Sequence, residues 1–575
     1  SGDTLTNHGA FIGTGHLYDA GLVTNSGSIG QTVTLTGAGY LNNNGAITGA
    51  DYGVYGLTGA DGTFINTGVI TGTSSAGVFL LNGGMVTNGD TAHTDARISG
   101  GVYGLYITGA PGTIVNYGTI SRTGTKAISL KDGGAVYNHG LISGGGSALY
   151  ISGTGYVHNS GTIANASNGI RFHGAGTLNN TGSISGSSAG VYAVGGASTI
   201  NNSGTVSGNV AVLFSDAAGT YNNTLINSGA LIGSGGTAVQ FGAGNDTLEL
   251  LAGGSFTGQV DGGAGNNTLE FGGTTAGTFT GLGGANLTNF GIVNVDSGAS
   301  WTFTGDNTVD SGIVLTNAGT AIAGGTFTNA GSIDNTAGVF DVSGVLKNDS
   351  TITGVVTLIG SGSLNNTGYI GQVGGSIGVQ GAGGSTPIIT NSGSIFGRNA
   401  SGIDLANGGT VANAATGVIY GGTDGIKVST AAGIVTNYGS ITGHSGIGVA
   451  MYARGTISNA GTAAYIHGAT YGIKLGNGGS VSNAGTILSY NGVGIFANSG
   501  GGNTTIVNGS TANTAALIQG FTGGVNAYGT ITVNITNFGT IKATDSSSTA
   551  VILGNGGTAN HATLSYNDTA SLFDG

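Results

Sequence analysis

The chain has 575 residues, of which 124 are Gly, 2 are Pro and none is Cys. Only 6 % are charged, against roughly 25 % in an ordinary soluble domain, and the formal net charge is −12. The Gly content disfavours helices, the missing Cys excludes disulfides and zinc–thiolate sites, and the acidic balance argues against a nucleic-acid partner. Because 38 % of the residues are hydrophobic, the chain is not a flexible linker or a disordered segment. A folded β-rich protein is expected.

A repeat organises most of the chain. The motif Asn-x-Gly, followed by any residue and then Ile, Val or Leu, recurs from Asn25 to Asn537, and its steps between Asn116 and Asn202 are 21 or 22 residues. Self-similarity at a fixed period is typical of solenoid proteins. The copies begin at Asn25, Asn66, Asn116, Asn138, Asn159, Asn180, Asn202, Asn227, Asn366, Asn391, Asn437, Asn483 and Asn537.

One unit is clearest at residues 391–413. Its short apolar runs alternate with a period of two, which is typical of strands, and its loops contain Gly and Asn, which tolerate positive φ in tight turns. One unit cannot bury its own apolar side, but stacked units can. The sequence therefore predicts an all-β fold, a long single-stranded parallel β-helix with about 22 residues in each of roughly 26 coils. Coils of this length with uneven turns are more usual for the right-handed form, which we expect.

The repeated Asn is expected to have a structural role. Stacked on its counterpart in the next coil, each side-chain amide can form hydrogen bonds along the axis, as amide ladders do in cross-β structures. The Gly that follows the Asn is expected to permit the turn.

Composition divides the chain into three regions. Residues 1–240 and 355–575 carry the regular repeat. Residues 241–354 are rich in Phe and acidic residues, contain the only Trp, Trp301, and break the Asn-x-Gly spacing. The alternation of TLELLAGGSFTGQV indicates that this stretch still coils, either as an irregular β-helical segment or as a subdomain.

A segment of the central stretch resembles a calcium-binding repeat. Residues 242–250 read GAGNDTLEL, close to the GGxGxDxUx nonapeptide of RTX proteins, with Asp246 at the ligand position. A second copy has Asn267 at that position. Because calcium takes about 6–8 oxygen ligands, one complete copy does not suffice. A Gly/Asn turn stacked on itself is therefore favoured over a calcium site at Asp246, and no other metal or cofactor is expected.

Catalysis is not expected either. Enzymes that cut polysaccharides place carboxylates together in one groove, whereas the 23 acidic residues of this chain are thinly spread. The closest pairs, Asp306 with Asp310 and Asp246 with Glu249, have no nearby Arg or His in the sequence. No catalytic residue is assigned.

One outward column stands out. In each run of Gly or Ala, then Ile, Val or Leu, then a third residue, that third residue points to solvent if the second points inward. In the first half this position holds the aromatic residues Tyr55, Phe79, Tyr106, Tyr150 and Tyr192, and among or after them Ser129, Arg171, Leu213 and Gln240. In the second half it holds the charged residues Asp404, Lys427 and Lys474. Two interpretations are open: an aromatic ladder that packs on itself or under a loop, and a platform for sugar rings or a docking strip for a partner.

The iterated NxGxI…GIxLxxGGxVxN unit, the GAGNDTLEL segment and the low content of Cys, Pro and charge resemble the passenger domain of bacterial autotransporters (type V secretion). The resemblance covers nearly the whole chain. It implies export by an outer-membrane β-barrel translocator, which this sequence does not contain. It also implies a location outside the cell or at the bacterial outer-membrane surface.

The expected function is that of a non-enzymatic adhesin, which binds host or matrix glycans and associates with copies of itself in biofilm or host attachment. Many weak contacts along a repeat protein can add up through avidity. The first alternative is a structural subunit of an extracellular filament or surface layer. The second is a polysaccharide-active β-helix enzyme.

Overall fold

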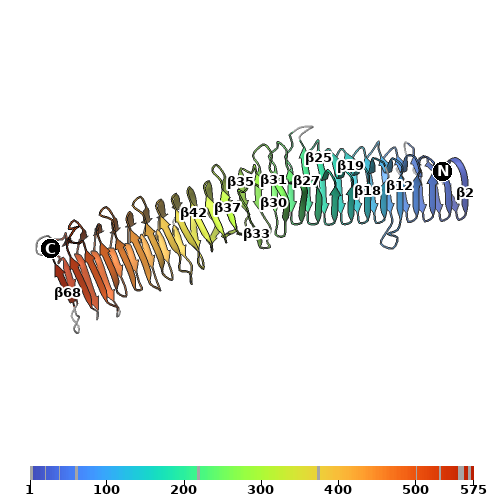
Figure 1. Cartoon of the computed structure of the whole chain (residues 1–575). Coiled ribbons are helices and arrows are strands. Elements are labelled where there is room, and N and C mark those ends of the chain that lie inside the picture. Colours follow the sequence, from blue (N-terminus) through green and yellow to red (C-terminus); the bar gives the residue numbers. More distant parts are fainter. Residues whose placement is uncertain are drawn as a thin grey trace. The chain divides into compact units, whose positions relative to one another are not determined.

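A computed structural model describes residues 4–19, 21–37, 39–57, 62–122, 124–215, 220–371, 374, 376–499, 502–529, 532–554, 562–566 and 572–574. The chain folds as an all-β parallel solenoid of about 24 turns, which confirms the expected fold class (Figure 1). The described residues form strands and no helix, so none of them belongs to a helix long and apolar enough to cross a membrane. Inserted loops make the turns fewer than expected, since 28 residues separate Asn88 from Asn116 and 29 separate Asn508 from Asn537.

Three short strands make up one coil. In one regular coil, β20 (Gly155–Asn159) is followed by β21 (Thr162–Asn165) and β22 (Asn168–His173), and β23 (Gly176–Asn180) starts the next coil. Buried and half-buried residues alternate along β20 and β23, because successive side chains of a strand point to opposite faces.

Successive coils stack in register. β17 (Gly134–Asn138), β20 and β23 pair in parallel, so that Val136, Val157 and Leu178 lie one above another. All three side chains are fully buried. Each coil therefore buries its apolar side against its neighbours, as the repeat predicted.

The repeated Asn residues form two hydrogen-bonded ladders. From Asn7 to Asn227, each Nδ2 donates to the Oδ1 of the Asn in the next coil at 2.7–2.9 Å. A second ladder runs from Asn329 to Asn537 at 2.7–2.8 Å. These side chains are buried. Buried polar groups are tolerated when they are hydrogen-bonded, as these amides are. The structural role expected for the Asn column is confirmed.

The Gly of the Asn-x-Gly turn is required for a reason other than the expected one. Gly182 and Gly204 do not have a positive φ. A Cβ at Gly182 would lie 2.2 Å from the carbonyl oxygen of Gly161, so the close stacking of successive turns excludes a side chain. Positive φ occurs instead at Gly-Gly pairs such as Gly133 and Gly134, at 81° and 135°. The expectation based on turn dihedrals is therefore correct for the Gly-Gly pairs and wrong for the Asn-x-Gly turns.

The chain divides into two compact units. Unit 1 comprises Ser1–Gly272 and Ala285–Ile292, and unit 2 comprises Gly273–Gly284 and Val293–Gly575. Each unit has its own Asn ladder, and the division falls within the Phe-rich central stretch. That stretch still coils, since β36 (Ser300–Phe303) pairs in parallel with β39 (Thr320–Ala323).

Aromatic rings fill the core of unit 2 near its start. Trp301, Phe303, Phe327 and Phe340 are at most 1 % exposed. The ring of Phe327 lies 5.5 Å from that of Phe303 and 5.6 Å from that of Phe340, in edge-to-face contacts. The high Phe content of the central stretch thus serves packing.

Candidate functional site

The outward aromatic residues lie in one column of unit 1. Strands β7 (Val54–Gly56), β10 (Ala76–Leu80) and β13 (Tyr103–Ile107) pair so that Tyr55 is aligned with Phe79 and Phe79 with Tyr106. The column exists because a solenoid places residues one coil apart in sequence next to each other in space.

The same column continues over the following coils. β16 (Lys126–Leu130), β19 (Ser147–Ser152), β22 and β25 (Ala189–Val194) bring in one residue each. In register, these residues are Ser129, Tyr150, Arg171 and Tyr192. All five aromatic residues singled out in the sequence are therefore in one row, and each is half-buried.

The first part of the column is a stack of rings. The ring of Phe79 lies 4.7 Å from that of Tyr106 with an interplanar angle of 10°, and 5.6 Å from that of Tyr55. Two neighbouring tyrosines join the stack, since the ring of Tyr52 lies 4.9 Å from that of Tyr55 and the ring of Tyr103 lies 4.9 Å from that of Tyr106. Neighbouring rings of this part of the column therefore pack on one another, face to face at Phe79 and Tyr106 and tilted at the other contacts, while each side chain keeps part of its surface exposed.

The second part of the column pairs rings with cations. Lys126 Nζ lies 3.6 Å from the ring centroid of Tyr150, and Lys131 Nζ lies 5.4 Å from it. The Arg171 guanidinium lies between two rings, 6.0 Å from that of Tyr150 and 5.0 Å from that of Tyr192. Such contacts are cation–π interactions. The sequence alone did not single out Lys126 and Lys131, which lie outside the column position, although the density of basic residues between 97 and 171 was a usable signal.

Ser129 interrupts the aromatic column. It occupies an outward position between Tyr106 and Tyr150, yet it is fully buried, and its Oγ has no hydrogen-bond partner. Buried hydroxyls without a partner are uncommon. Ser129 therefore has the outward register of the column but the full burial of a core residue.

The cations around Tyr150 have no acidic counterpart within ion-pair distance. In the described part of the chain, ion pairs join only Asp90 to His93 and Asp404 to Lys427. Burial, followed by repulsion from Lys131 and Arg171, lowers the pKa of Lys126. An uncompensated cluster of this kind attracts anions in a chain whose net charge is −12.

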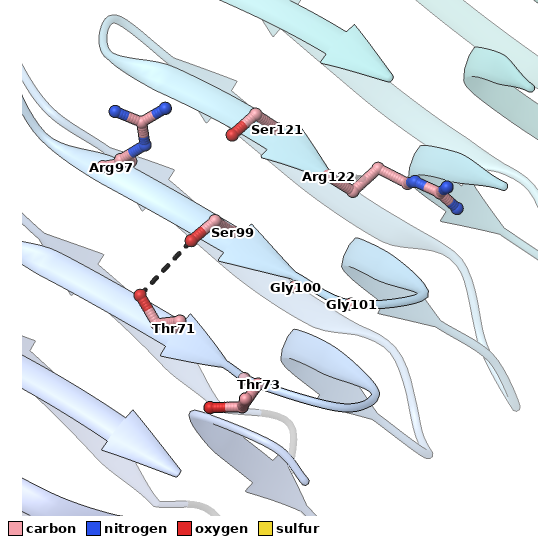
Figure 2. Close-up of a pocket in the computed structure, with 9 residues that line it drawn as sticks. Thr71, Thr73, Arg97, Ser99, Gly100, Gly101, Ser121 and Arg122 are labelled. Atoms are coloured by element: carbon pink, nitrogen blue, oxygen red, sulfur yellow. Dashed lines mark hydrogen bonds between the residues drawn. The ribbon is translucent and has the colours of Figure 1, made fainter. Parts of the chain in front are cut away.

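A shallow pocket of about 500 Å³ lies at the corner before β13. Thr71 and Ser99 line it with their hydroxyls 3.3 Å apart, and Figure 2 shows the guanidinium groups of Arg97 and Arg122 pointing away from one another. Arg122 is buried and donates from Nη1 to the carbonyl oxygen of Val102 at 2.7 Å. This pocket has hydroxyls but no convergent charge.

Asp246 belongs to a buried ladder of its own. Its Oδ1 accepts hydrogen bonds from the backbone N of Asn223 at 2.6 Å and from Asn223 Nδ2 at 3.0 Å, and its backbone N donates to Asn267 Oδ1 at 2.9 Å. The side chain is fully buried. The calcium-like turn is thus stacked on its Asn counterparts. Among the described residues, no group of three or more His, Cys, Asp or Glu side chains is placed to hold a metal ion.

In unit 2 the corresponding outward column is charge-paired. Lys427 Nζ lies 3.0 Å from Asp404 Oδ2, and this hydrogen bond raises the pKa of Lys427. Lys474 Nζ lies 4.7 Å from the ring of Tyr452. Lys427 thus contacts a carboxylate and Lys474 contacts a ring, whereas three cations share the one ring of Tyr150.

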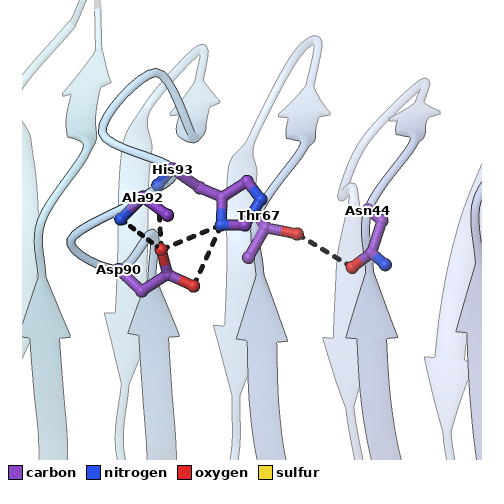
Figure 3. A network of polar contacts seen from close by, with 5 residues as sticks. All are labelled: Asn44, Thr67, Asp90, Ala92 and His93. Carbon is purple, nitrogen blue, oxygen red and sulfur yellow. Dashed lines mark hydrogen bonds and ion pairs between the residues drawn. The ribbon is translucent and has the colours of Figure 1, made fainter.

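An inserted loop between β11 (Gly84–Asn88) and β12 (Arg97–Gly100) contains an exposed ion pair, shown in Figure 3. His93 Nδ1 lies 2.8 and 3.0 Å from the two carboxylate oxygens of Asp90, and this contact is the main cause of the lowered pKa of Asp90. The loop sequence NGDTAHTDA recurs in unit 2 as NGSTANTAA at residues 508–516. There the hydroxyl of Ser510 accepts from the backbone N of Asn513. In both loops the side chain of the third residue thus accepts from the backbone N three residues later, Asp90 from His93 and Ser510 from Asn513.

The fold and this outer face define the class of the protein: a parallel β-solenoid with an aromatic and cationic column in unit 1. No protein-family model matches the chain, and neither a curated protein nor a solved structure is detectably similar to it.

Proposed function

We propose that the protein is a non-enzymatic adhesin of the bacterial cell surface, or a secreted one, which binds glycans through the outward column of unit 1. The observation that carries the proposal is the alignment of aromatic and cationic side chains along one outer face, from Tyr55 to Tyr192. Aromatic side chains offer apolar ring surface to sugars. Repetition along the coils supplies many weak contacts at once.

A quadruple substitution tests this proposal. Serine at four column positions removes four of the five aromatic side chains of the column while the inward core residues remain unchanged, and we expect loss of binding on a glycan array. The substituted residues are Tyr55, Tyr106, Tyr150 and Tyr192.

The matched control removes four exposed tyrosines of unit 2, Tyr369, Tyr438, Tyr452 and Tyr490. This variant is expected to bind like the unchanged chain. Unchanged binding by the column variant, with its β-rich circular dichroism intact, contradicts the proposal. Turnover of any polysaccharide on the same array contradicts the non-enzymatic part of it.

Self-association is supported by a separate face. In unit 2 the Asn-ended strands form a 12-stranded sheet, which includes β47 (Ile388–Asn391), β53 (Gly433–Asn437) and β65 (Val533–Asn537). From β47 to β65 the outward positions carry no charged side chain, and Ile388 and Ile434 are at least half exposed. In a chain of net charge −12, an uncharged face lets two copies approach with less repulsion than a face that carries acidic side chains.

Paired acidic substitutions test self-association. Thr436→Glu together with Ser482→Glu places charge on this face, and we expect any dimer or larger assembly seen by sedimentation velocity to dissociate. The control places Glu at Thr177 and Thr199, outward positions of unit 1. An unchanged assembly in the first variant contradicts this mode of association.

A further inference from the structure

A shallow groove of about 570 Å³ crosses five neighbouring coils of unit 2. It lies on the outer face of the 12-stranded sheet, where β53, β56 (Gly455–Asn459), β59 (Gly479–Asn483), β62 (Thr504–Asn508) and β65 begin. The second residue of each of these strands points outward and lines the groove. The pairing of the strands aligns these residues in one row, which comprises Ile434, Thr456, Ser480, Thr505 and Asn534.

Short polar side chains line most of the groove. Thr456, Ser480 and Thr505 carry hydroxyls, and the Ser480 hydroxyl donates to Thr456 Oγ1 at 3.2 Å. The amides of Asn503 and Asn534 are exposed in the same groove. Hydroxyl and amide groups both donate and accept hydrogen bonds. Successive coils therefore offer such groups to one ligand at intervals of about 4.8 Å.

One cation lies at the groove. Arg454 immediately precedes β56, is exposed, and is the only charged residue among the described residues that line the groove. In the described part of the chain no carboxylate pairs with its guanidinium. The planar fork of a guanidinium binds a carboxylate or a sulfate through two parallel hydrogen bonds. Arg454 is therefore placed to bind an acidic group of a ligand in the groove.

The coils around the groove are rich in positive charge relative to the rest of the chain. Residues 425–544 contain four basic residues and no acidic one, a formal charge of +4 in a chain whose net charge is −12. An anionic ligand can therefore approach this part of the solenoid without repulsion from its own coils. This observation is independent of the shape of the groove. The four basic residues are Lys427, Arg454, Lys474 and Lys542.

The direction of the groove favours an extended polymer over a compact ligand. The five aligned positions follow the axis of the solenoid and together span about 20 Å. A polysaccharide carries hydroxyl groups on every sugar unit, so successive units can bind successive coils. At the first coil of the groove, Ile434 is 50 % exposed and offers apolar surface to the C–H groups of a sugar ring.

We propose that this groove is a second glycan-binding site, which holds an acidic polysaccharide along the axis of unit 2. Hydroxyl groups of the polymer bind Thr456, Ser480 and Thr505, and a carboxylate or sulfate of the polymer binds Arg454. The site goes beyond the function proposed above, because it does not use the aromatic column of unit 1.

Calorimetric titration with matched polymers tests the groove. It is performed on the unchanged chain and on the column variant with four serine substitutions, which keeps the groove intact. Polygalacturonate is compared with its methyl ester, and dextran sulfate with dextran. In both proteins we expect the acidic member of at least one pair to bind about tenfold or more tightly than its neutral partner, as a charge-assisted hydrogen bond implies. The pair that responds tells whether the acidic group is a carboxylate or a sulfate.

Two variants address the groove itself. Arg454→Gln removes the guanidinium, and Ser480→Tyr fills the middle of the groove with a ring; each is expected to weaken binding of the acidic polymer by about tenfold or more. The control for charge is Lys347→Gln, in β42 (Val345–Asn348) of the same sheet. The control for size is Ser363→Tyr, a half-buried position of the same outward row outside the groove. Both controls are expected to bind like the unchanged chain.

The outcomes separate this inference from the function proposed for unit 1. If Arg454→Gln and Ser480→Tyr bind the acidic polymer as tightly as the unchanged chain does, the groove site is overturned and the column is unaffected. If the column variant binds no acidic polymer although its circular dichroism is unchanged, the groove is overturned and the column stands. Equal binding of acidic and neutral polymers overturns the role of Arg454. Loss of self-association in Arg454→Gln, without a change in polymer binding, assigns the groove to a contact between copies and overturns the inference too.

Discussion

At the scale of single residues, buried amides connect each coil to the next. Asn180 shows the pattern: its Nδ2 donates to Asn202 Oδ1 at 2.8 Å and to the carbonyl oxygen of Gly182 at 3.2 Å, while its Oδ1 accepts from Asn159 at 2.8 Å. Each such side chain therefore forms hydrogen bonds both with the Asn of the next coil and with a carbonyl oxygen of its own turn.

Asn180→Ala should therefore destabilise its coil strongly. It leaves buried donors and acceptors without partners, each worth about 1–3 kcal/mol, so we expect a local loss of about 2–5 kcal/mol. Hydrogen exchange of the β23 amides measures it. The control is Thr177→Ala, at a half-buried outward position of the same strand, which is expected to cost less than about 1 kcal/mol. Equal losses in the two variants contradict the ladder as the main link between coils.

The turn glycines give a second prediction at this scale. Gly182→Ala places a Cβ 2.2 Å from the carbonyl oxygen of Gly161, so the turns must separate and the unfolding temperature should fall. Gly383→Ala, which meets nothing within 4 Å and has no positive φ, should be neutral or stabilising by about 0.4–1 kcal/mol, because it lowers the entropy of the unfolded chain. Thermal unfolding followed by circular dichroism compares the two. If both variants lower the unfolding temperature, the steric explanation is refuted.

At the scale of elements, the outer faces of the strands are built from side chains that stack between coils. In unit 2, β57 (Tyr465–Gly468) pairs with β60 (Thr486–Ser489) and carries His467, which is 8 % exposed. The ring of Tyr490 lies 4.3 Å from the imidazole. Burial, followed by repulsion from His444, lowers the pKa of His467.

This lowered pKa predicts a pH dependence of stability. Below the unfolded-state pKa of about 6.5, the unfolded chain binds the proton more readily than the folded chain. Stability is therefore lost as the pH falls from about 6.5 toward the folded-state pKa. His467→Leu, which copies the aligned Leu488 of the next coil, should show a smaller decrease in unfolding temperature between pH 7.5 and 5.5. The other histidines are common to both proteins. Equal decreases in unfolding temperature in the two proteins would contradict a lowered pKa of His467 in the folded chain.

At the scale of the whole molecule, the two units each contain their own core and Asn ladder. Stability in a solenoid is the sum of coil stabilities and of interfaces between neighbouring coils. A chain of about 24 turns is therefore not expected to unfold in one cooperative step.

Calorimetry should resolve two unfolding transitions. Asn180→Ala should lower only the transition of unit 1, and Asn437→Ala, which removes a matching ladder residue, only that of unit 2. A single transition that both variants shift by the same amount refutes the thermodynamic independence of the units.

The sequence by itself determined the coil, the inward columns, the Asn ladders and the membership of the outward column. This was possible because residues one period apart become neighbours in a solenoid, so that sequence spacing predicts contact. Only the tertiary structure decided how the side chains use those positions. It stacked Phe79 face to face with Tyr106, placed Lys126 over Tyr150 from outside the column, and buried Ser129 at an outward position. Ring orientation, lysine reach and the approach of neighbouring turns depend on packing between coils, which no single repeat contains.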